Sequence, residues 1–133
     1  MNTLEKSERM VASIVAFLAE RGVERTDFSV AEIGFELTRE NDQLFSDAMI
    51  WLSAEGIIRS NDRIDYVAGK DNETVAISFS LTSFGFKLLS ETYEGELTLG
   101  QAVSKTNSSG VGYANVGNLL GGLLGSFTKS VSG

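Results

Sequence analysis

The sequence predicts a small α+β domain, because the spacing of its apolar residues changes period part of the way along the chain. Over roughly the first 55 residues, apolar side chains recur every three or four positions, which is typical of helices. Residues 63–81 instead alternate apolar and polar side chains around a turn-forming stretch, which is typical of a β-hairpin. A helical pattern returns at 82–92. We therefore expect three helices, a hairpin and a closing helix, in that order.

The first two helices are predicted from their apolar stripes and end signals. Residues 4–21 form the first, and Gly22 follows as a stop. Its stripe consists of Leu4, Val11, Ile14, Val15 and Leu18. Residues 29–38 form the second, which Ser29 and Glu32 begin with the spacing of a capping box. The side chains expected to be buried there are Val30, Ile33 and Leu37.

The third helix is predicted over residues 42–56. Asn41 or Asp42 is expected to cap its start, and Gly56 occupies the usual position of a C-terminal glycine. Its apolar side chains fall on one face, which we expect to be buried, and they are Leu44, Phe45, Ala48, Met49 and Leu52.

The strands are predicted from shorter runs. Residues 57–59 form a brief β-like stretch, and 63–68 and 74–81 form a hairpin around the turn sequence 69–73. On the second hairpin strand, simple alternation places four apolar side chains on one side: Val75, Ile77, Phe79 and Leu81. Thr82 begins the closing helix, which offers three side chains to the core: Phe86, Leu88 and Leu89.

Two segments resemble the winged helix-turn-helix superfamily. AEGIIRS at 54–60 is similar to the step from the third helix into the wing, with a glycine, two apolar residues and a basic one. SFSLTSFGFKLLSE at 78–91 is similar to the exit from the wing, with a strand, Leu-Thr, two residues, a glycine and a helix. The resemblance covers residues 8–93 and implies a winged helix, with DNA bound through the third helix as in most DNA-binding members. Another small α+β fold stays open as the alternative.

Three regions are expected along the chain. A winged-helix domain occupies 1–100, a polar linker 101–110, and a Gly/Leu-rich segment that could form a helix 111–133. The 133 residues include neither cysteine nor histidine, so there is no thiolate nucleophile, no Cys/His metal site and no imidazole base. The carboxylates lie in polar stretches without a paired setting. We expect a protein that is not an enzyme and uses no cofactor or metal, in a cytoplasmic setting.

Charge argues against the DNA binding that the resemblance implies. The net charge is −7, and all 18 acidic side chains lie within residues 1–100. From residue 40 to 58 there is no lysine or arginine, so the predicted third helix would repel phosphate. If DNA is bound nevertheless, Gln43 and Ser46 would face the bases. The phosphates would then be contacted by Arg39, Arg59, Arg63 and Lys70.

The first hypothesis is therefore a regulatory module that acts by protein contact. Ile50 and Trp51 would anchor a protein partner or a second copy of the chain, because exposed tryptophan is enriched at interfaces. Packing of Trp51 against the wing or the first helix is the alternative for that side chain. The rival hypothesis is a DNA-binding transcriptional regulator. A third is an acidic protein that occupies the nucleic-acid-binding site of another protein.

The segment 117–133 carries glycine at every fourth position from Gly117 to Gly125. In a helix these glycines would form one flat face, opposite a bulky apolar face that includes Leu119, Leu120, Leu123, Leu124 and Phe127. With Gly122 beside them there are four glycines, which cost a helix about 3–4 kcal/mol, so close packing or an apolar environment must offset them. Three alternatives stay open: a membrane-spanning helix, an element that self-associates or docks on a partner or at a membrane surface, and a disordered end.

Overall fold

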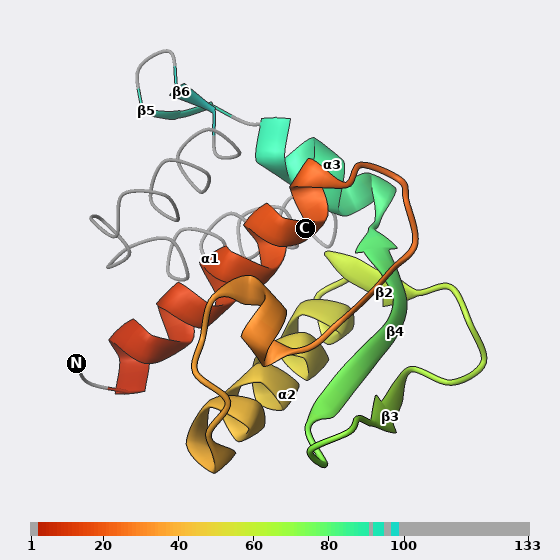
Figure 1. The fold of residues 1–133 in the computed structure, drawn as a ribbon. Helices are drawn as coiled ribbons and strands as arrows, with labels where there is room; N and C mark the ends of the chain where they lie inside the picture. Colours follow the sequence, from red (N-terminus) through yellow and green to blue (C-terminus); the bar gives the residue numbers. More distant parts are fainter. Residues whose placement is uncertain (1–2, 91, 95–96, 99–133) are drawn as a thin grey trace.

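Three α-helices and a small antiparallel sheet make up the described part of the chain, which confirms the α+β class (Figure 1). The structure is a computed structural model that describes residues 3–90, 92–94 and 97–98. The helical elements are α1 (Thr3–Glu20), the 3-10 helix η1 (Val30–Ile33), α2 (Arg39–Ala54) and α3 (Ser83–Ser90). The strands are β1 (Thr26–Phe28), β2 (Ile58–Ser60), β3 (Tyr66–Ala68), β4 (Thr74–Leu81), β5 (Thr92–Glu94) and β6 (Leu97–Thr98).

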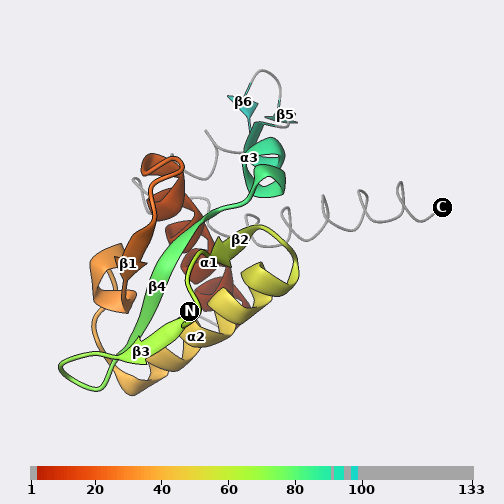
Figure 2. The same ribbon diagram turned by 90° about the vertical axis from the view of Figure 1, so that its right-hand side faces the viewer.

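The core lies between α1, α2 and one face of the sheet, as Figure 2 shows. The predicted stripe of α1 is confirmed from Val11 to Leu18, and in the predicted stripe of α2 only Leu44 is partly exposed. Three phenylalanines join the layers: the rings of Phe17 and Phe28 lie 4.9 Å apart, and Phe28 meets Phe45 edge-on at 5.5 Å. Each large apolar side chain buried in this way stabilises the fold by about 1.5–3 kcal/mol.

The prediction of an α-helix over residues 29–38 was wrong. The chain there makes the four-residue η1 and then stops at Gly34, whose φ of 93° is left-handed and ends the turn. Ser29 precedes η1, but its side chain makes no capping hydrogen bond. As a result only Val30 of the expected stripe is buried, and Leu37 is 39% exposed. The strand β1, which precedes η1, was not predicted. Its Phe28 side chain is completely buried.

The helix α2 begins three residues earlier than predicted. Its cap is Thr38, whose hydroxyl accepts a hydrogen bond from the Asn41 N–H at 3.0 Å, so neither Asn41 nor Asp42 has that role. The predicted end is confirmed, since Gly56 adopts a φ of 76° directly after the last turn.

The sheet is organised around β4, the longest strand. One edge of β4 pairs with β1, while its other edge pairs with β3 at Thr74–Ala76 and with β2 at Phe79–Leu81 (Figures 1 and 2). All pairs are antiparallel, so the predicted hairpin of β3 and β4 is confirmed. The predicted strand over residues 63–68 is shorter than expected, because β3 holds only its last three residues.

A β-bulge divides β4 and overturns the predicted alternation. Ser78 has a φ of 54°, and β4 advances from Ala76 to Phe79 while β1 opposite it advances only from Phe28 back to Thr26. The inward-facing side chain before the bulge is Ala76, whereas Phe79 and Leu81 point inward after it. The side chains at positions 75 and 77 are therefore only half-buried, contrary to the prediction for Val75 and Ile77.

The exit from the sheet is a close contact between backbones. Thr82 donates its N–H to the Ile57 carbonyl at 2.9 Å, and its hydroxyl accepts from the Gly85 N–H at 2.9 Å, which caps α3. A Cβ on Gly85 would overlap the Ile57 carbonyl oxygen, so only glycine fits there. The helix ends at Ser90 rather than at 92, and β5 follows.

None of the helices in the described ranges is long and apolar enough to cross a membrane. The predicted linker 101–110 and the segment 111–133 lie outside the described residues, and so do Leu119, Leu120, Leu123, Leu124 and Phe127.

Candidate functional site

The outward side of α2 is an acidic surface with an apolar centre. Its exposed side chains recur every three or four residues along the helix, and we call them the α2 outer face: Glu40, Gln43, Asp47, Ile50 and Ala54. Ile50 is 59% exposed. After Arg39, the helix has no basic residue. This surface combines one exposed aliphatic anchor with two carboxylates.

Two internal contacts hold polar groups of the α2 outer face. Lys6 on α1 pairs with Glu40 at 2.7 Å, and this hydrogen bond and the lysine charge lower the pKa of the Glu40 carboxyl. The Gln43 amide donates to a carboxylate oxygen of Asp47 at 3.1 Å. Gln43, the strongest candidate for base recognition, is therefore engaged by an acidic neighbour on its own helix.

The β3–β4 hairpin is fastened to α2 by side chains. The Asp42 carboxylate accepts hydrogen bonds from the Thr74 N–H at 2.9 Å and from the Thr74 hydroxyl at 3.0 Å. The Ser46 hydroxyl donates to the same threonine oxygen at 3.3 Å. We call these three residues the Asp42 clasp. Ser46 therefore points to the hairpin of its own domain rather than away from it.

A second contact joins the hairpin to α2 farther along the helix. The Tyr66 ring packs at 5.6 Å from Phe79, and its hydroxyl is hydrogen-bonded to Ser53. Burial raises the pKa of the Tyr66 phenol, the charge of Asp65 adds to the rise, and the Ser53 hydrogen bond opposes it. The hairpin is thus held at two well-separated points along α2.

The two predicted anchors are placed differently. Trp51 is partly buried and packs against the core, while Ile50 is exposed one position earlier. Along the helix, Ile50 lies four residues after Ser46 and three before Ser53, so it lies on the side of α2 that borders the hairpin.

The candidate phosphate-binding residues are spread over the start of α2 and the length of the sheet. Arg39 begins α2, Arg63 lies in the loop between β2 and β3, and Lys70 lies in the β3–β4 turn, all exposed. Arg59 on β2 pairs with Ser80, near the opposite end of β4 from that turn. Six strand residues span about 20 Å, so the structure does not bring Arg59 and Lys70 together.

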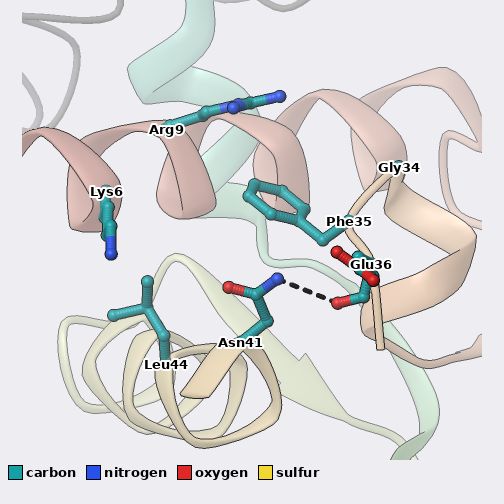
Figure 3. Close-up of a pocket in the computed structure, with 7 residues that line it drawn as sticks. All are labelled: Lys6, Arg9, Gly34, Phe35, Glu36, Asn41 and Leu44. Carbon is teal, nitrogen blue, oxygen red and sulfur yellow. Dashed lines mark hydrogen bonds between the residues drawn. The ribbon is translucent and has the colours of Figure 1, made fainter. Parts of the chain in front are cut away.

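A cleft of about 200 Å³ lies between α1, the residues after η1, and the start of α2 (Figure 3). Arg9 stacks over the Phe35 ring at 5.0 Å, and the Asn41 amide donates to the Glu36 carbonyl at 2.8 Å. Lys6 is already paired with Glu40. These contacts within the protein link the three elements around the cleft. The residues that line it include one carboxylate and no acid–base pair.

Sequence reasoning missed two features of the described part of the molecule. The Asp42 clasp joins residues 32 positions apart, and Arg25 shares a hollow with Arg59, 34 positions later. Neither is signalled by local spacing, since each depends on how the helices and strands pack. The sequence showed that Asp42 would lie near the start of the helix, but it did not show that Thr74 would be its partner.

The chain was compared with protein-family models, with curated proteins and with solved structures, and no significant match was found in any of the three.

Proposed function

We propose that this chain is a non-catalytic winged-helix module that regulates by binding another protein, with the α2 outer face as its contact surface. The order of elements supports the winged-helix part of the proposal: α1, η1 and α2 precede a hairpin, and α3 closes the unit. In this interpretation η1 is the reduced second helix, β3–β4 the wing and α2 the third helix.

The observation that carries the proposal is the exposure of Ile50 within an acidic surface. A bulky aliphatic side chain that is more than half exposed on a capped helix is available as an anchor. Asp47 precedes it on the same face of the helix, and so does Glu40, which is already paired with Lys6. Complementarity therefore calls for a protein segment that presents an apolar residue with basic residues beside it.

The same surface is poorly suited to duplex DNA. A groove-bound α2 would bring Glu40 and Asp47 close to phosphates, and Gln43 would have to leave its bond with Asp47 to reach a base. The cations that could offset this repulsion lie at separate places, at the start of α2 and along the sheet. DNA recognition by this helix would therefore lack both positive charge and free base-reading groups.

The Gly/Leu-rich segment 111–133 is the second part of the proposal. Its four-residue glycine spacing favours self-association or docking on a partner, and this part rests on the sequence alone.

The test compares the full-length protein with Ile50→Glu and with the control Ile64→Glu. Ile64 is also exposed, at 57%, but lies in the β2–β3 loop. After cross-linking in cell extract, we expect a defined set of proteins to be captured by wild type and Ile64→Glu and lost with Ile50→Glu. Equal capture by all three proteins would contradict the proposal.

A second measurement addresses DNA directly. Fluorescence anisotropy with a labelled random duplex at about 50 mM salt is expected to show no binding at micromolar protein concentration. Micromolar binding that weakens steeply with added salt would favour the DNA-binding regulator instead.

A further inference from the structure

A hollow of about 240 Å³ opens where three separate segments meet: the loop after α1, the end of β2 and the start of α3. Arg25 comes from the first segment, Arg59 and Asn61 from the second, and Ser83 from the third. Ser80 of β4 also lines it. The hollow shares no residue with the α2 outer face, so it is a separate site from the proposed protein contact.

The charge of the hollow is positive in a chain that is otherwise acidic. Two arginines line it, and no aspartate or glutamate does. Within residues 6–90, neither guanidinium forms an ion pair or a hydrogen bond with another described residue. Guanidinium groups bind oxyanions through paired N–H donors, and two of them at one small hollow favour a multiply charged anion.

The floor of the hollow adds a buried hydroxyl. Ser80 is 6% exposed, and its oxygen accepts a hydrogen bond from the Asn61 amide at 3.0 Å. The same amide also donates to the Ser78 carbonyl at 2.9 Å, which fixes its orientation. A serine hydroxyl can donate as well as accept, and the Ser80 hydroxyl finds no acceptor among the described residues. An acceptor bound in the hollow would satisfy this buried donor.

The N-terminal end of α3 adds a further hydrogen-bond donor to the lining of the hollow. Thr82 caps the helix and satisfies the Gly85 N–H, but the N–H of Ser83, the first helical residue, has no acceptor among the described residues. Helix N-termini carry partial positive charge and bind anions. The residues that line the hollow thus carry two guanidiniums, a buried hydroxyl and a backbone N–H at a helix start.

We propose that this hollow binds a phosphate group, carried by a small phosphomonoester. Its volume lies below the range of about 300–1,000 Å³ for sites that enclose drug-sized ligands, so it fits a phosphate rather than a whole nucleotide. Three kinds of donor, which converge from different segments, match a tetrahedral dianion better than a planar carboxylate. Val23, 85% exposed, and the partly buried Phe86 form an apolar rim for the organic part of the ester.

The experiment is a titration of the full-length ¹⁵N-labelled protein with phenyl phosphate and, separately, with inorganic phosphate. We expect saturable amide shifts centred on Ser80, Ser83 and Asn61, with a dissociation constant on the order of 1 mM or lower for phenyl phosphate. Binding by phenyl phosphate that is several-fold tighter than that of inorganic phosphate identifies a monoester as the ligand. Equal affinities identify the free ion and overturn the monoester part of the proposal.

Two variants and one control make the test specific. Arg25→Gln and Arg59→Gln each remove one guanidinium from an exposed position and should weaken binding at least tenfold. Arg39→Gln removes the same charge from the start of α2 and should leave the affinity unchanged. Loss of affinity in Arg39→Gln equal to that in the other two would show non-specific attraction and overturn the site. So would the absence of saturable shifts at about 20 mM phenyl phosphate, well above the expected dissociation constant.

Discussion

The two halves of β4 are held to the rest of the molecule by different kinds of contact. After the bulge, Phe79 and Leu81 lie in the core, and Thr82, which follows the strand, makes a backbone hydrogen bond to Ile57. Before the bulge, only the small side chain of Ala76 lies in the core, and the polar side chains of the Asp42 clasp attach the strand to α2. One continuous strand therefore contains a half fixed by packing and a half fixed by a few removable side chains.

The packed half should be the more sensitive to a single added methyl group. Gly85→Ala places a Cβ against the Ile57 carbonyl, so the backbones of α3 and β2 must separate, and we expect a loss of about 3 kcal/mol in the free energy of unfolding. Chemical denaturation monitored by circular dichroism measures it. In Gly56→Ala the Cβ meets nothing and only the left-handed φ is strained, so the loss should be about 1 kcal/mol. Equal losses would refute the close-contact explanation.

The half of β4 before the bulge, which the Asp42 clasp attaches to α2, should become less stable when the Asp42 carboxylate is removed. Asp42→Ala removes both hydrogen bonds to Thr74, and we expect it to cost about 1–2 kcal/mol. Amide hydrogen exchange should accelerate in residues 66–76 and not in residues 79–81. Asp47→Ala, on the exposed side of the same helix, should change stability by less than about 0.5 kcal/mol. Uniform acceleration along β4 would show that the two halves are one cooperative unit.

Substitutions at Ser78, in the bulge between the two halves, should change stability least. The order of stability of the two variants nevertheless shows whether the bulge is present. Because Ser78 has a left-handed φ of 54°, Ser78→Gly should be more stable than Ser78→Ala by about 0.5–1 kcal/mol. At a regular strand position the order is reversed, with glycine less stable than alanine by a similar amount. Thermal denaturation of the two variants decides between them. Greater stability of the alanine variant would mean that β4 runs straight through residue 78.

Local patterns predicted those elements whose stability is decided locally. The long apolar stripes of α1 and α2, and the hairpin of β3 and β4, were all predicted correctly in type. The motif around Gly85 was recognised as a pattern, and its physical reason became visible only when Ile57 was placed beside it.

The errors had two sources, a local stop signal and a long-range contact. A capping-box sequence at Ser29 did not make an α-helix, because Gly34 ends the turn. The alternation of β4 failed at Ser78, where the Asp27 carboxylate accepts the serine N–H at 2.8 Å and supports the bulge. That bond joins residues 51 positions apart, so no window of sequence could indicate it.

The candidate site was partly visible in the sequence. The acidic character of α2 and the prominence of Ile50 follow from helical spacing alone, whereas the burial of Trp51 depends on neighbours that the sequence does not reveal. The hollow between Arg25 and Arg59 could not be predicted, because it exists only where three segments converge.

The division of one edge of β4 between β2 and β3 has a consequence for behaviour at high concentration. The outer strands β1, β2 and β3 have three residues each, and residues 61–65 interrupt the line between β2 and β3. A foreign strand needs a long, uninterrupted row of N–H and C=O groups to pair with. The rims of this sheet offer only short rows, so the domain is a poor template for cross-β aggregation even though its longest strand is rich in β-branched residues.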